Sequence, residues 1–154
     1  MLPILTKPVA ITMPTALADD TSPTTTEVDT DGFDYLSVYL YIGATDIALT
    51  ALKVQETDTS GSGYSDVSGT DFSSSTNLDV GGAALALPSA TADTTWRVVH
   101  INLTGRKRYL DLAFTVGNGT AGGWYYAFGI LSRSRNQALT NAGLAGTNGI
   151  CVVV

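Results

Sequence analysis

The residues best able to do chemistry in this chain of 154 amino acids are a lone histidine, a short run of aspartates and a basic triplet. His100 stands within an alternating apolar segment, and no recognisable serine or cysteine nucleophile motif lies near it. Nucleophilic catalysis needs a base, a nucleophile and an orienting group that converge, so we interpret His100 as an ordinary strand residue. We therefore expect no catalytic residue and no enzymatic activity.

The aspartates of "DTDGFD", Asp29, Asp31 and Asp34, could offer oxygen ligands to Ca²⁺. Their spacing lacks the third acid before the glycine and the later glutamate of an EF-hand loop. We interpret the segment as an Asp-rich turn that precedes a strand. The sequence accordingly predicts no bound metal and no cofactor.

The basic triplet consists of Arg106, Lys107 and Arg108, in a chain with only eight lysines and arginines. It is too short for a nucleic-acid footprint, and the net charge of −6 also disfavours direct nucleic-acid binding. Two interpretations remain: a solvated turn, or an electrostatic contact with an acidic partner surface. Residues 1–95 have a net charge of −11 and residues 96–154 a net charge of +5, which favours the contact. Arg133 and Arg135 are further candidates for it.

Four aromatic residues, Trp96, Trp124, Tyr125 and Tyr126, form a second candidate for binding. On an open sheet they would suit sugar stacking, but such residues also build sandwich cores and subunit interfaces. We favour the core or interface interpretation, and we predict that Trp124 and Tyr125 contact a partner.

The elements that must position these residues are strands. Hydrophobic residues make up 44% of the chain and charged residues only 14%, and threonine, serine and glycine are abundant. Apolar residues alternate with polar or aromatic ones in several segments, as in strands with one buried face. The inward-facing sets that we predict are Val9, Ile11 and Met13; Leu36, Val38, Leu40 and Ile42; Leu52 and Val54; Val99, Ile101 and Leu103; and Leu110, Leu112, Phe114 and Val116.

These strands predict an all-β fold, an antiparallel β-sandwich or jelly roll of about seven or eight strands. The turn residues in "TGRKR" and "GNGTAGG" predict two consecutive hairpins, which join residues 96–103, 109–116 and 124–131. The long segment 71–95 is expected to contain a short strand near Ala83–Leu87 or to cross over the sandwich.

We expect residues 1–135 to form a single β-sandwich domain with an N-terminal arm, and residues 136–154 to form a C-terminal tail. The apolar end of this tail would aggregate if left in water, so we predict that it adds a strand to its own sheet or reaches a neighbouring subunit. The residues of this inter-subunit arm are Ile150, Cys151, Val152, Val153 and Val154. No apolar run is about 18 residues long, so we expect no membrane span.

Three stretches, "GFDYLSVYLYIGATD", "LTALKVQETDTSGSGYSDVSG" and "RKRYLDLAFTVGNGTAGGWYYAFGIL", occur in this order between about Val9 and Leu131. In order and pattern the chain resembles a group of small structural proteins of tailed bacteriophages. Beyond Arg135 it departs from their pattern.

The resemblance implies a virion protein of jelly-roll or β-sandwich fold, a head decoration or cement protein that binds outside the major capsid shell and stabilises the head. The implied partners are the major capsid protein and other copies of the chain, in a homo-oligomer such as a trimer. The implied location is the head surface of the virion, after synthesis in the host cytoplasm. The alternative that the aromatic residues leave open is a carbohydrate-binding or host-adhesion module of a virion.

Overall fold

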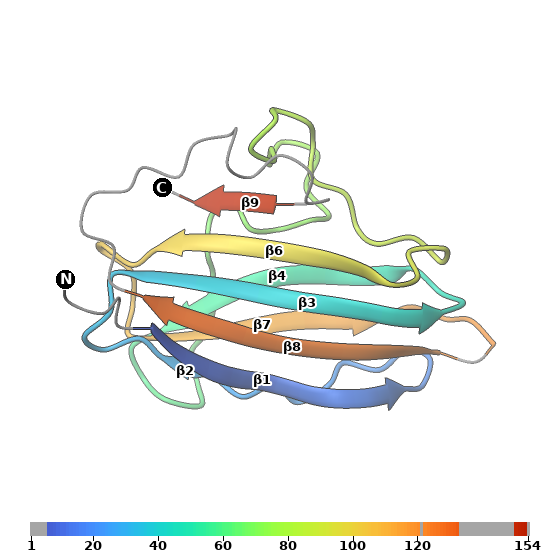
Figure 1. The fold of residues 1–154 in the computed structure, drawn as a ribbon, viewed down its shortest axis with the longest axis horizontal. Helices are drawn as coiled ribbons and strands as arrows, with labels where there is room; N and C mark the ends of the chain where they lie inside the picture. The colour runs from blue at the N-terminus through green and yellow to red at the C-terminus, as the bar shows by residue number, and fades with distance from the viewer. Residues whose placement is uncertain (1–5, 121, 133–149, 154) are drawn as a thin grey trace.

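The computed structural model describes residues 6–120, 122–132 and 150–153, and these residues form strands and no helix (Figure 1). Two sheets are stacked face to face. The front sheet has the order β1-β8-β3-β6-β9, and the back sheet has the order β2-β7-β4-β5. In chain order the strands are β1 (Thr6–Leu17), β2 (Val28–Asp29), β3 (Tyr35–Thr45), β4 (Leu49–Thr57), β5 (Ser65–Asp66), β6 (Thr95–Asn102), β7 (Tyr109–Val116), β8 (Gly123–Ser132) and β9 (Ile150–Val153). The predicted all-β sandwich is therefore confirmed.

The apolar alternation builds the core. Inward side chains from both sheets are buried in one cluster, whereas their strand neighbours face outward. This burial removes apolar surface from water and is the main force that holds the two sheets together. The predicted inward residues of β3, β4, β6 and β7 all belong to this cluster, as does Leu103 just after β6.

The strand pairs are nested. β1 pairs with β8, β2 with β7, β3 with β6 and β4 with β5, and each of these pairs is antiparallel. Within the described residues, β4 and β5 are the only consecutive strands that pair with each other. The chain passes from one sheet to the other at most of its turns. β9 is the exception to the antiparallel pattern, because it lies parallel to β6 at the edge of the front sheet.

The two predicted hairpins are wrong. β6 and β8 lie in the front sheet, while β7 lies between β2 and β4 in the back sheet. The segments "TGRKR" and "GNGTAGG" therefore carry the chain from one sheet to the other. Gly105 and Gly122 do have positive φ angles, of 75° and 70°. Turn residues reverse the chain whether the next strand joins the same sheet or the opposite one, so turn chemistry alone did not identify the pairing.

The long segment 71–95 contains no strand near Ala83–Leu87. Its ladder contact is a single isolated bridge between Leu78 and Ala84. The segment crosses from β5 in the back sheet to β6 in the front sheet, which was the other expectation. Phe72 and Leu85 anchor it, because both side chains are buried in the core.

Candidate binding surface

The basic triplet lies in the connection between β6 and β7, where side chains of the same chain already bind it. Arg108 donates two parallel hydrogen bonds to Asp29, from Nε to Oδ1 at 2.9 Å and from Nη2 to Oδ2 at 2.7 Å. Arg106 forms an ion pair with Glu56, with 3.5 Å between Nη1 and Oε1. Lys107 donates from Nζ to Ser65 Oγ at 3.0 Å. The triplet thus links β2, β4 and β5 to the start of β7.

The electrostatics of this link follow from its geometry. The hydrogen bonds from Arg108 hold the pKa of Asp29 at about 2, and the same contact raises the pKa of Arg108. Asp29 Oδ1 also accepts a hydrogen bond from the backbone N–H of Asp31, which closes the Asp-rich turn expected in this segment. In the described part of the chain, no group of three or more His, Cys, Asp or Glu residues could hold a metal ion. Contact between the triplet and a partner stays a prediction.

The outer face of the front sheet carries a connected group of aromatic rings, which we call the aromatic face: Tyr39, Tyr41, Trp96, Tyr126 and Phe128. The register of β3 with β6 and β8 places these residues side by side. The rings of Tyr39 and Phe128 are stacked with centroids 4.9 Å apart, and those of Tyr41 and Trp96 are also 4.9 Å apart. Tyr126 stacks on Phe128 at 5.5 Å. Trp96 remains 37% exposed, so solvent reaches the group.

The outward positions around the aromatic face bear no Asp, Glu, Lys or Arg. On β3, β6 and β8 these positions are Tyr35, Ser37, Tyr39, Tyr41, Trp96, Val98, His100, Asn102, Trp124, Tyr126, Phe128, Ile130 and Ser132. His100 lies beside Ser37, with 2.7 Å between Nδ1 and Oγ. Burial lowers the pKa of His100, which favours the neutral imidazole near pH 7. The face is therefore aromatic and uncharged, and that combination is uncommon on a solvent-facing sheet.

Trp124 and Tyr125 lie on opposite faces of β8, because successive side chains of a strand alternate. Trp124 is 55% exposed on the outer face. Tyr125 is only 1% exposed, and its ring packs in the core against Phe114 with centroids 5.6 Å apart. The structure thus corrects the prediction for Tyr125, whose side chain is not on the surface, and leaves Trp124 as the candidate contact of the two.

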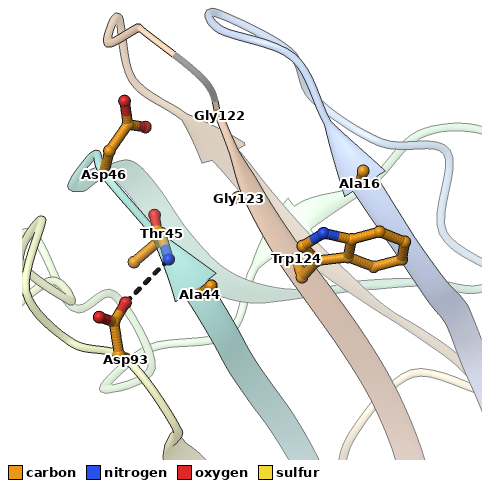
Figure 2. A pocket seen from close by; sticks show the side chains of 8 residues that line it. All are labelled: Ala16, Ala44, Thr45, Asp46, Asp93, Gly122, Gly123 and Trp124. Atoms are coloured by element: carbon orange, nitrogen blue, oxygen red, sulfur yellow. Dashed lines mark hydrogen bonds between the residues drawn. The ribbon is translucent and has the colours of Figure 1, made fainter.

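A pocket of about 370 Å³ opens where β1 and β3 end and β8 begins (Figure 2). Trp124 stands on one side of it, and Asp46 and Asp93 stand on the other. Thr45 and the small residues Ala16, Ala44, Gly122 and Gly123 line the rest of the pocket.

The two glycines allow β8 to begin this close to its neighbours. At Gly122 the φ angle is +70°, and a Cβ atom would lie 1.9 Å from the carbonyl oxygen of Leu17. At Gly123 a Cβ atom would lie 2.8 Å from Thr45 Oγ1 and 2.7 Å from Tyr125 Oη. Any larger side chain would force these strands apart.

The remaining candidates lie at the C-terminal end. Ile150, Cys151, Val152 and Val153 form β9, whose register with β6 runs from Val98 opposite Ile150 to Ile101 opposite Val153. The tail thus adds a strand to its own sheet in this structure, and a role between subunits stays a prediction. Arg133, Arg135 and Val154 lie outside the described residues.

Sequence reasoning did not single out Tyr39, Tyr41 or Phe128 as candidate binding residues. The signal for Tyr39 and Tyr41 was their alternation with Leu36, Val38, Leu40 and Ile42, which points them away from the core. What the sequence alone did not provide was the register that brings β3, β6 and β8 together.

Scans against protein-family models, curated proteins and solved structures each found no match to this chain. Among the described residues, no helix is long and apolar enough to cross a membrane.

Proposed function

We propose that this protein is a virion structural protein, a decoration or cement protein that binds the outside of the major capsid shell of a tailed bacteriophage and stabilises the head. The single observation that carries the proposal is the aromatic face on the outer side of the front sheet. The sequence resemblance supplies the class of partner.

The aromatic face has the composition of a protein-binding surface. Interface centres are poor in charged residues and rich in Tyr, Trp and Phe. Here five such side chains contact one another across three strands, so their rotamers are already restricted before a partner arrives. Rigid aromatic side chains lose little conformational entropy on binding, which makes such a surface suited to affinity.

The strand order supports the architecture that we assign to this class. A jelly roll has eight strands in two sheets and is common among viral capsid and lectin domains. Strands β1 to β8 divide into two sets of four, with the nested pairs β1–β8, β2–β7, β3–β6 and β4–β5. We infer from this order that the sandwich is a jelly roll to which β9 adds one edge strand.

Assembly on a shell suits a protein of this kind. A capsid repeats the same surface many times, so a subunit that binds both the capsid protein and other copies of itself gains avidity from modest contacts. The homo-oligomer in this proposal is a trimer or another small ring that spans adjacent capsomers.

Sedimentation with undecorated phage heads tests the proposal. The wild-type protein should bind saturably, with a fixed copy number per capsomer. Trp96→Lys and Trp96→Ala should reduce binding, while Thr50→Lys, at an exposed position of β4 in the back sheet, should bind like the wild type. Melting temperatures of the three variants establish that each is folded. A lack of saturable binding by the wild-type protein would refute the proposal.

Salt dependence separates the two candidate contacts. Binding through the uncharged aromatic face should change little between low and high salt, since screening acts on charges. Binding through Arg106, Lys107 and Arg108 should weaken steeply over the same range. A steep dependence together with normal binding by Trp96→Lys would move the contact from the aromatic face to the triplet.

A further inference from the structure

We propose that the pocket beside Trp124 is a saccharide-binding site that accepts one neutral pyranose ring. The site is separate from the aromatic face in its chemistry, because it combines one exposed indole with two carboxylates. The inference does not depend on capsid binding.

The apolar wall of the site is Trp124. This side chain is 55% exposed, although it is the largest residue that borders the pocket. At Gly43, in the neighbouring strand β3, a Cβ atom would lie 3.0 Å from Trp124 Cβ, so the absent side chain gives the tryptophan its room. An exposed indole next to a hollow offers a flat apolar surface on which the C–H face of a sugar ring can lie.

The polar wall consists of Asp46 and Asp93, and the backbone fixes the position of each. Asp93 Oδ1 accepts a hydrogen bond from the backbone N–H of Thr45 at 2.8 Å, and Figure 2 shows this contact at the edge of the pocket. Asp46 Oδ2 accepts one from the backbone N–H of Thr120 at 3.0 Å. A carboxylate has about four lone-pair positions, so Asp93 can accept further bonds from hydroxyl groups. Preordered acceptors of this kind lower the entropic cost of binding.

The size of the pocket agrees with a small polar ligand. Its volume of about 370 Å³ lies near the lower end of ligand pockets, which span roughly 300 to 1,000 Å³. Ala44 and Gly123 leave the space between the two walls free of long side chains. A ligand that contacts both walls must therefore be flat and must have one apolar face and a polar rim. A pyranose has this shape.

Two other classes of ligand fit the site less well. Phosphate, sulfate and acidic sugars would be repelled by Asp46 and Asp93. Quaternary ammonium ions are held best inside cages of several aromatic faces, whereas Trp124 is the one aromatic residue that borders this pocket. A neutral saccharide can contact both walls. It carries no negative charge for the carboxylates to repel, and it needs only one aromatic face.

NMR titration of the ¹⁵N-labelled protein tests the inference with glucose, galactose, N-acetylglucosamine, N-acetylneuraminic acid and choline as probes. We expect at least one neutral sugar to bind saturably, with a dissociation constant on the order of 1 mM. The shifted resonances should be the Trp124 indole N–H and the backbone amides of Thr45 and Gly123.

Variants locate the site. Trp124→Ala should weaken sugar binding roughly tenfold or more, and Trp124→Phe should retain part of it. Asp93→Asn keeps an oxygen acceptor for the Thr45 N–H but removes the charge, and it should weaken binding less than Asp93→Ala does. Trp96→Ala is the matched control and should bind sugar normally.

The outcomes distinguish this site from the capsid contact. Asp93→Ala removes an acceptor of the pocket from a loop outside the aromatic face, so it should weaken sugar binding and bind undecorated heads like the wild type. Trp96→Lys should lose head binding and keep sugar binding. The inference is overturned if no neutral sugar binds saturably, if choline or the acidic sugar binds more tightly than every neutral one, or if Trp124→Ala binds sugar as well as the wild type does.

Discussion

Arg108 and Asp29 form a bidentate ion pair, in which Nε and Nη2 of the guanidinium donate to Oδ1 and Oδ2 of the carboxylate at 2.9 Å and 2.7 Å. This contact joins the first strand of the back sheet to the start of β7, which is its register partner. Such paired geometry fixes orientation more strongly than a single contact does. Two of the three adjacent cations at this turn are balanced by acids from distant parts of the chain, since Arg106 pairs with Glu56 and Arg108 with Asp29.

The Arg108–Asp29 pair should make stability depend on pH in the acid range. The pKa of Asp29 is about 2 in the folded protein, against an ordinary value of 3.8. The unfolded chain therefore binds the proton first as the pH falls, so the contribution is full above about pH 4 and is lost towards pH 2. Arg108→Met should remove this part of the acid dependence in urea unfolding at pH 4.5 and pH 2. Asp29→Asn should remove the same part of the acid dependence, and the double variant should show no further change in that dependence.

Gly129 should resist substitution because it faces the core from β8. A Cβ atom there would lie 2.9 Å from Val9 Cγ2 and 3.0 Å from Leu36 Cδ1. We expect Gly129→Ala to lower the free energy of unfolding by about 1–3 kcal/mol, the usual cost of overpacking a core. Gly81→Ala is the control, since Gly81 is exposed and its new methyl group would meet only the Asp79 carboxylate, at 3.3 Å from Oδ1. Equal urea midpoints for the two variants would contradict the tight fit at Gly129.

His100 should make the protein less stable between pH 7 and pH 5. Burial lowers its pKa below the ordinary 6.5, so the unfolded state takes up a proton more readily than the folded state. Its contribution is present above pH 6.5 and is lost as the pH falls from there towards the lower folded pKa. His100→Gln should flatten the decline of the melting temperature over this range. Burial raises the pKa of Asp111, which affects both proteins alike, so the comparison isolates the imidazole. Parallel pH profiles for the two proteins would disprove the assignment.

The C-terminal strand should matter more for assembly than for folding. β9 has only four residues and contacts one strand, β6, in a parallel ladder. The core cluster of the described side chains runs from Ile11 to Leu131 and remains in the chain when residues 149–154 are deleted, so we expect the melting transition to persist. If the tail exchanges between subunits, the oligomer mass measured by light scattering should fall on deletion. An unchanged mass would show that the strand serves only its own sheet.

The local pattern of the sequence was enough to predict which side chains face the core. Leu36, Val38, Leu40 and Ile42 alternate without interruption, and all four are buried in the cluster between the sheets. The same reasoning failed for Met13, which is 68% exposed. The register of β1 with β8 shifts twice between Ala10 and Thr15, and each such irregularity changes which face the following residues take.

The pairing of strands and the make-up of the two binding surfaces could not be predicted in the same way. Tyr39 meets Phe128 only because β3 lies next to β8, although 88 positions separate the two residues in the chain. The pocket likewise depends on Asp93, in a loop, lying beside Thr45 at the end of β3. Such contacts are set by the packing of the whole sandwich, and alternation carries no information about them. Residue type did not separate Trp124 from Tyr125, because the phase of β8 decides which of the two side chains is exposed.

The nested pairing of strands also bears on how a newly made chain becomes a folded one. β1 needs β8 as its partner, from Lys7 opposite Leu131 to Leu17 opposite Gly123. At synthesis rates of roughly 5–20 residues per second, the first strand leaves the ribosome about 5 to 20 seconds before the eighth. During that interval the backbone N–H and C=O groups on both edges of β1 have no strand partner. The same holds for β1 of the chain on the next ribosome of the same mRNA. Neighbouring nascent chains are thus prone to capture each other through β1, in the seconds before β8 is available to pair with it.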